Sequence, residues 1–222
     1  MKSMFKPLII TAINLFFAVG VIHAKTFNAC NPNWFIQPDS LTKAKRNEII
    51  QQLDSILKID QKYRPIIRSV RKEFGNESDT IKKLWKVIAY NDSMSLIKVT
   101  DILDHYGWLG PEAISNDGNR ALFFVIQHSN KTTMEKYLPM MKEAVTKGNA
   151  DPDLLALLID RTELLNDRPQ IYGSQVQMID GKYVLYKTID IKNVNSRRAE
   201  VGLGPLEEYL KEMKVDFKMP DN

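Results

Sequence analysis

Apolar residues recur at three- and four-residue spacing along most of this chain, and the spacing shortens to two only in the last quarter. The first pattern is typical of one buried face of an α-helix, and the second of a half-buried β-strand. We therefore predict a mainly α protein, a helical bundle or array, with one β-hairpin in its C-terminal half. The helical patterns cover residues 41–60, 66–74, 79–106, 116–127, 133–147, 152–165, 193–201 and 205–213.

Turn and capping residues set the expected ends of these elements. The hairpin is expected at residues 175–188, where apolar residues alternate on both sides of Asp180-Gly181. Pro65 is expected to kink or restart the chain near residues 60–64, because proline disrupts a helix interior. The tripeptide Asn91-Asp92-Ser93 either divides one helical pattern or lies within it. The expected N-caps are Ser40, Ser78 or Asp79, and Thr132 or Thr133.

The first 24 residues have the form of a secretory signal peptide. Lys2 and Lys6 precede an apolar run over residues 8–22, and Ala24 offers a small residue for cleavage. We expect export to the periplasm or the exterior after cleavage near Ala24. An uncleaved membrane anchor is the first alternative and a lipoprotein the second. Beyond the signal we expect a flexible leader at 25–39, a single helical domain at 40–214 and a tail at 215–222.

Composition narrows the choice of partner. The formal net charge is +4, and removing residues 1–24 takes away two lysines and no acid, which leaves +2. No basic stripe interleaved with aromatic residues stands out, so we expect no nucleic acid. Contact with a membrane is expected only through an uncleaved leader. Cys30 is the single cysteine, so an intramolecular disulfide is excluded.

His128 is the first candidate for chemistry, because histidine titrates near neutral pH and can act as a base or a ligand. It ends a strongly apolar helix, where a hydrogen bond to a backbone carbonyl is the structural alternative. Asp101 and His105 share a helix face and resemble half a metal site, but catalytic zinc usually has three protein ligands. We therefore expect no metal and no cofactor.

Asp160 and Arg161 lie in an apolar helix and point about 100° apart, so they are not expected to pair with each other. A buried charge is unfavourable unless it has a partner. Available partners are Asp60, Arg64, Arg197 and Arg198, either as a structural ion network or as the lining of a pocket. The polar patch that follows contains Gln170, Tyr172, Gly173 and Gln175, which suits ligand orientation and structural hydrogen bonding equally.

Several motifs occur together in a fixed order. They are Asp60-Gln61-x-Tyr63-Arg64, Tyr106-Gly107-Trp108, Ile126-Gln127-His128, Tyr137-Leu138-Pro139, Leu157-x-x-Asp160-Arg161, Pro169-Gln170-x-Tyr172-Gly173-x-Gln175 and Arg197-Arg198 with Gly202-Leu203. Over residues 45–213 this set resembles a bacterial family known only as a domain of unknown function, often found behind signal or lipoprotein leaders. Ser174 stands where that family is expected to carry threonine. The resemblance implies no reaction, but it implies a shared polar signature: Asp60, Gln61, Arg64, His128, Asp160, Arg161, Gln170, Tyr172, Gln175 and Arg197.

Three functions remain open from the sequence. The first is binding of a small polar or anionic ligand by Asp60, Gln61, Arg64, Arg161, Gln170, Tyr172, Gln175 and Arg197. The second is a hydrolase in which His128 acts as base and Asp160 orients it, with Arg161 and Gln175 stabilising negative charge. The third is a structural or interaction module of the cell envelope. No nucleophile motif, phosphate loop or dinucleotide fingerprint is present, so whether the protein is an enzyme stays undecided.

Overall fold

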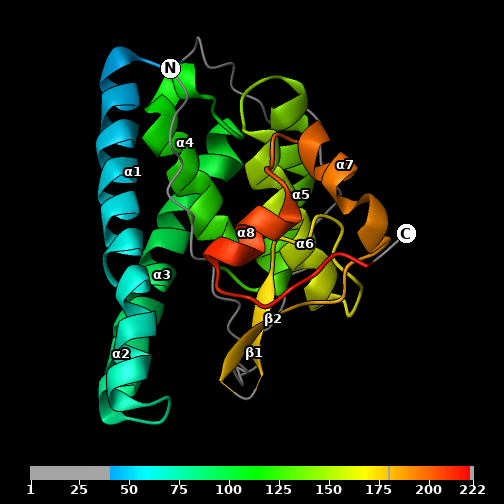
Figure 1. Cartoon of the computed structure of the whole chain (residues 1–222). Coiled ribbons are helices and arrows are strands. Elements are labelled where there is room, and N and C mark those ends of the chain that lie inside the picture. Colours follow the sequence, from blue (N-terminus) through cyan, green and yellow to red (C-terminus); the bar gives the residue numbers. More distant parts are fainter. Residues whose placement is uncertain (1–40, 180, 221–222) are drawn as a thin grey trace.

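The computed structural model describes residues 41–179 and 181–220 (Figure 1). The predicted signal peptide, the leader and Asp180 of the expected turn lie outside the described residues. Thr42, and not the expected Ser40, caps the first helix, since its Oγ1 accepts a hydrogen bond from the Lys45 amide at 3.2 Å. The helices are α1 (Lys43–Tyr63), α2 (Ile67–Phe74), α3 (Asp79–Tyr106), α4 (Pro111–Gln127), α5 (Lys131–Thr146), α6 (Pro152–Leu165), α7 (Val194–Glu200) and α8 (Leu206–Glu212). Short 3-10 turns cover Arg64–Ile66 and Ile191–Asn193, and the strands are β1 (Val176–Ile179) and β2 (Lys182–Leu185). The predicted fold class is confirmed.

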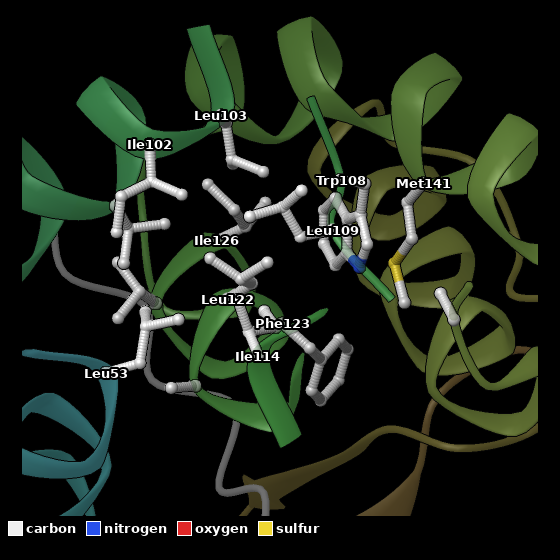
Figure 2. Close-up of a cluster of buried hydrophobic side chains, with 14 of the residues drawn as sticks. Leu53, Ile102, Leu103, Trp108, Leu109, Ile114, Leu122, Phe123, Ile126 and Met141 are labelled. Atoms are coloured by element: carbon white, nitrogen blue, oxygen red, sulfur yellow. The ribbon is translucent and has the colours of Figure 1, made fainter. Parts of the chain in front are cut away.

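The main apolar core forms around α4, because the C-terminal half of this helix is apolar on every side. All seven residues from Ala121 to Gln127 are buried, and α4 contacts α1, α3, α5 and α6. A helix that is apolar all round must be enclosed by other elements. Figure 2 shows the side chains that meet there, among them Leu53, Ile102, Leu103, Trp108, Leu109, Ile114, Leu122, Phe123, Ile126 and Met141.

The expected break near Pro65 is confirmed. Helix α1 ends at Tyr63, and a 3-10 turn that contains Pro65 leads into α2. Helix α2 then packs on the first half of α3, and the two form a separate apolar cluster centred on Ile67, Ile81 and Ile88. This pair extends below the rest of the bundle in Figure 1. Residues 91–93 do not interrupt α3, which is one continuous helix of 28 residues.

Two further expected helix starts were wrong. Asn130, and not Thr132 or Thr133, caps α5, since its side-chain oxygen accepts a hydrogen bond from the Thr133 amide at 2.9 Å. Helix α4 begins at Pro111, before the expected residue 116, but Ser115 has a non-helical φ of 68° within it. The Ser115 hydroxyl accepts the Gly118 amide at 3.1 Å, so the regular helix restarts close to the expected position. Ser78 caps α3 as expected.

The C-terminal quarter builds a second, smaller core. Strands β1 and β2 pair antiparallel with Val176 opposite Leu185. Figure 1 shows α8 near the upper end of the strands, with α7 further from them. Val176, Val194, Leu206 and Leu210 are buried together. The expected hairpin is confirmed, although its strands end before residue 188. Within the described residues, no helix is both long and apolar enough to cross a membrane.

Gly173 should be the most sensitive glycine of this C-terminal core. Its φ is +70°, and a Cβ built there would lie 2.9 Å from Cδ1 of Leu206. We predict that Gly173→Ala lowers the free energy of unfolding by about 2 kcal/mol, because it adds backbone strain to a steric conflict. Gly148→Ala is the matched control, since Gly148 has a φ of +74° and nothing within 4 Å. Equal losses in urea unfolding of both variants would contradict the steric part of this argument.

Candidate functional site

Three helices, α1, α3 and α4, bring ionisable side chains to one place, which we call the His128 cluster: Asp60, Arg64, Asp92 and His128. Asp60 lies in the last turn of α1, and Arg64 follows four residues later at the helix end. Nδ1 of His128, at the end of α4, lies 2.9 Å from Oδ1 of Asp60. Arg64 bridges the two carboxylates: its Nε donates to Asp60 at 3.1 Å and its Nη2 donates to Asp92 at 2.6 Å.

The Asp60 carboxylate is the centre of this cluster. Its side chain is 3% exposed, and it also accepts a hydrogen bond from Nε2 of Gln61 at 2.6 Å. Burial alone would raise the pKa of Asp60, but His128, Arg64 and Gln61 outweigh burial and lower it to about 2. Asp60 is therefore ionised at every pH at which the protein is expected to work. Burial acts in the same way on Asp92 and raises its pKa, against the opposing charge of Arg64.

The ionised Asp60 fixes the tautomer of His128. A carboxylate can only accept, so Nδ1 of His128 must carry the hydrogen and Nε2 must present its lone pair. Burial lowers the pKa of His128, and the charges of Arg64 and Arg161 add to this effect, while Asp60 opposes it. The ring is therefore neutral at neutral pH. It also stacks on Phe124, with centroids 6.0 Å apart and planes at 12°.

Nε2 of His128 remains open to solvent. It makes no hydrogen bond in the described chain, and it is not fully buried. The side chain is 10% exposed, so a small part of the ring is reachable. His128 thus has the arrangement of a positioned base, with one nitrogen held by a carboxylate and the other free.

Arg161 of α6 lies within electrostatic reach of this cluster but has no partner of its own. Its Nε is buried without a hydrogen-bond partner, and no ion pair of Arg161 occurs within residues 41–179 and 181–220. Burial and the charge of Arg64 lower the pKa of Arg161 to about 10, which leaves the guanidinium charged at neutral pH. Tyr186 is the other titratable neighbour that acts on it. A buried cation without a counter-charge is unfavourable, so this residue requires an explanation.

Asp160, the neighbour of Arg161, has a different role. Its carboxylate accepts three backbone N–H groups: Oδ1 accepts from Ile171 at 2.7 Å and Tyr172 at 2.9 Å, and Oδ2 accepts from Ser174 at 2.8 Å. Its side chain is fully buried. Burial raises the pKa of Asp160, and these backbone hydrogen bonds oppose that rise. Asp160 therefore holds the segment 170–175, which we call the Asp160 loop, against α6.

Side chains of one glutamine and two arginines also bind the backbone of the Asp160 loop. Gln170 folds back on Gln175, since its Oε1 accepts the Gln175 amide at 2.8 Å and its Nε2 donates to the Gln175 carbonyl at 3.1 Å. Arg197 donates to the carbonyl of Ile171, and Arg198 donates to the carbonyl of Tyr172. Most of these polar groups are therefore used to fix backbone.

The structure thus divides the predicted site residues into two groups. Asp60, Gln61, Arg64 and His128 meet through hydrogen bonds, and Arg161 acts on them through its charge. Gln170, Tyr172 and Gln175 lie in the Asp160 loop, and Asp160 and Arg197 hold that loop through hydrogen bonds to its backbone. Asp60, rather than Asp160, is the carboxylate that contacts the His128 ring. A hydrolytic mechanism would have to use that pair.

Sequence reasoning missed Asp92 and Tyr186 as members of this region. Asp92 was considered only as a helix breaker, yet it lies on the face of α3 that meets Arg64. The spacing of Asp92 from the buried Ile88 and Ser95 could have indicated that face. Nδ1 of His105 lies 3.2 Å from Oδ1 of Asp101, and both side chains are exposed. The described residues contain no group of three or more His, Cys, Asp or Glu side chains that could hold a metal.

A hollow of about 500 Å³ lies at the C-terminal end of the described chain, and none of its lining residues belongs to the His128 cluster. The lining consists of Glu207, Lys211, Lys214, Val215, Asp216 and Phe217.

Next to His128 in the sequence, both side-chain amide atoms of Gln127 are buried without a hydrogen-bond partner in the described chain. The candidate site is therefore the His128 cluster with Arg161, and not the hollow.

Comparison with known proteins identifies a family of unknown function (DUF6624), whose model matches residues 47–219. The chain belongs to this family. The resemblance stated from the motifs is therefore confirmed. No curated protein and no solved structure matches the chain.

The Asp160 loop should depend on both oxygens of its carboxylate. We predict that Asp160→Asn lowers the free energy of unfolding by about 3 kcal/mol, because the new NH₂ group cannot accept a backbone N–H. Asp117→Asn on α4 is the control, since that side chain is 66% exposed and lies 3.9 Å from Arg120. Urea unfolding of both variants measures the difference, and an unaffected Asp160→Asn protein would contradict this role.

The His128 cluster should also make stability depend on pH. The folded pKa of His128 is lowered from 6.5, so the unfolded chain binds a proton first, and stability is lost as pH falls below about 6.5. Asp60 adds a second loss between about pH 4 and 2, because its folded pKa is depressed to about 2. We predict that His128→Gln removes the first loss, measured by urea unfolding from pH 7 to 5. An exposed His105→Gln control should behave like the wild type.

Proposed function

We propose that Arg161, together with His128, binds a small oxyanion such as a carboxylate or a phosphodiester group. The observation that carries this proposal is the Arg161 guanidinium, which is half-buried and charged but has no anionic partner in the described chain. A guanidinium presents two parallel N–H groups that match the two oxygens of such an anion. A bound oxyanion would supply the counter-charge that the protein side chains do not.

The neighbouring charges support a ligand that carries a single negative charge. Arg64 is already bonded to both Asp60 and Asp92, so its positive charge is used within the His128 cluster. His128 is neutral at neutral pH because burial lowers its pKa. One guanidinium is then left to balance the ligand, while the carboxylates of the cluster repel further negative charge. This argument favours monoanions over dianions near neutral pH.

Limited exposure supports a small ligand group. His128 is 10% exposed, and Nε of Arg161 is buried, so only a few ligand atoms can reach both residues. A larger ligand fits only if its remaining part stays in solvent. Export near Ala24 is part of this proposal, because the predicted signal peptide would place the site outside the cytoplasm, among cell-envelope solutes.

Anion binding should appear as stabilisation that depends on Arg161. A monoanion at 100 times its Kd stabilises the folded state by about 2.7 kcal/mol, which raises Tm. We predict this shift for methanesulfonate, acetate or dimethyl phosphate at constant ionic strength, with chloride as the reference salt. Arg161→Gln should weaken binding about 10- to 100-fold, because it removes the charge-assisted hydrogen bonds. Calorimetric titration gives the affinities.

Two controls make this test specific. Arg168→Gln removes an exposed arginine that is already paired with Glu163, and it should leave the anion effect unchanged. Without added anion, Arg161→Gln should be as stable as the wild type or more stable, because it removes an unpaired buried charge. A strongly destabilised Arg161→Gln protein, or a wild type that responds to no oxyanion, would contradict the proposal.

A further inference from the structure

We propose that this site takes up its anion together with one proton, and that the proton binds Nε2 of His128. The inference rests on the proposed anion site and adds the chemistry of what is bound: an oxyanion plus a proton, rather than the anion alone. Two geometric observations carry it. Nδ1 of His128 lies 2.9 Å from Oδ1 of Asp60, and Nε of Arg161 is buried without a hydrogen-bond partner in the described chain. The charge of Arg161 also opposes the imidazolium form of the ring.

The position of the proton follows from the hydrogen bonds. Nδ1 already carries a hydrogen, since it lies 2.9 Å from a carboxylate that can only accept. Nε2 is therefore the only ring atom that can gain a proton. Once protonated, the ring keeps its hydrogen bond to Asp60, which becomes a bond between opposite charges. No side chain has to move for this step.

The charges around the ring decide when it is protonated. Asp60 of α1 favours the imidazolium, whereas Arg64 after α1 and Arg161 of α6 oppose it. Asp92 of α3 is bonded to Arg64, and Tyr186 after β2 is neutral and acts on Arg161. Burial adds to the two arginines and keeps the pKa of the free ring low. Burial and the two arginines therefore outweigh Asp60, and the His128 ring of the free protein is neutral at neutral pH.

A bound anion shifts that balance in one direction. It neutralises Arg161, which removes one of the two positive charges opposing the imidazolium, and it adds a negative charge near the ring. The pKa of His128 therefore rises on binding. By linkage, a rise in proton affinity on anion binding equals a rise in anion affinity on protonation. Between the free and bound pKa of His128, the Kd should rise about tenfold per pH unit as pH increases.

Calorimetric titration with methanesulfonate tests this coupling, because that monoanion does not titrate in the range used. Titrations of the full chain in buffers with different ionisation enthalpies give the number of protons taken up. We expect between zero and one proton, with a maximum between the pKa of His128 in the free protein and its pKa in the complex. The Kd should rise with pH over the same interval.

Variants separate His128 from other titrating groups. His128→Gln should bind methanesulfonate with a Kd that is independent of pH and with no proton uptake. His105→Gln, which changes the exposed histidine of α3, should behave like the wild type. Asp60→Asn should shift proton uptake to lower pH, because it removes the negative charge that favours the imidazolium. Thermal melting at each pH verifies that the variants are folded.

The outcomes distinguish this inference from the proposed function. Binding that depends on Arg161 but takes up no proton overturns the coupling and leaves the anion site intact. Proton uptake that persists in His128→Gln assigns the proton to another group and also overturns it. No binding by the folded wild type at any pH contradicts the anion site itself.

Discussion

The hydrogen bonds of the Asp60 carboxylate are the constraint on which the rest of the site depends. This one group connects the end of α1 to the end of α4 through His128, and to the middle of α3 through Arg64 and Asp92. It lies where Pro65 ends α1, so the helix break and the ion cluster occupy the same position. Because Asp60 satisfies one ring nitrogen and one guanidinium, it also determines what is left over: a free Nε2 on His128 and an unneutralised Arg161.

The two buried aspartates show that burial alone does not define a role. Asp160 accepts three backbone N–H groups and has no cationic side chain bonded to it, so it acts as a fixed acceptor for a loop. Asp60 accepts from side chains that can titrate or exchange partners. Donors from the backbone cannot change with pH or ligand, whereas a histidine donor can. This difference explains why Asp160 serves the fold and why Asp60 is suited to a binding site.

Local patterns in the sequence were sufficient to predict the helices, the break near Pro65 and the hairpin, because each depends on neighbouring residues. The pairing of charged residues depends on tertiary packing and was only partly predictable. Asp160 was expected to find a charged partner or His128, but it is bonded to backbone amides that no side-chain pattern reveals. Asp92 was missed because its partner, Arg64, is 28 residues away in the sequence. The Asn130 cap was missed in favour of two nearby threonines, although asparagine is the stronger N-cap residue.

On α6, a residue that stabilises the fold and a residue proposed to bind a ligand are neighbours in the sequence. They have separate neighbours in space and separate roles. Asp160 and Arg161 have different neighbours on α6, since Asp160 is bonded to the Asp160 loop and Arg161 lies within electrostatic reach of His128. A purely structural network would be expected to neutralise both charges, since an unpaired buried ion lowers stability. Only Asp160 is satisfied in the described chain. The unsatisfied member of this pair therefore argues that stability was not the only constraint on α6, and that the charge of Arg161 is kept for something the protein binds.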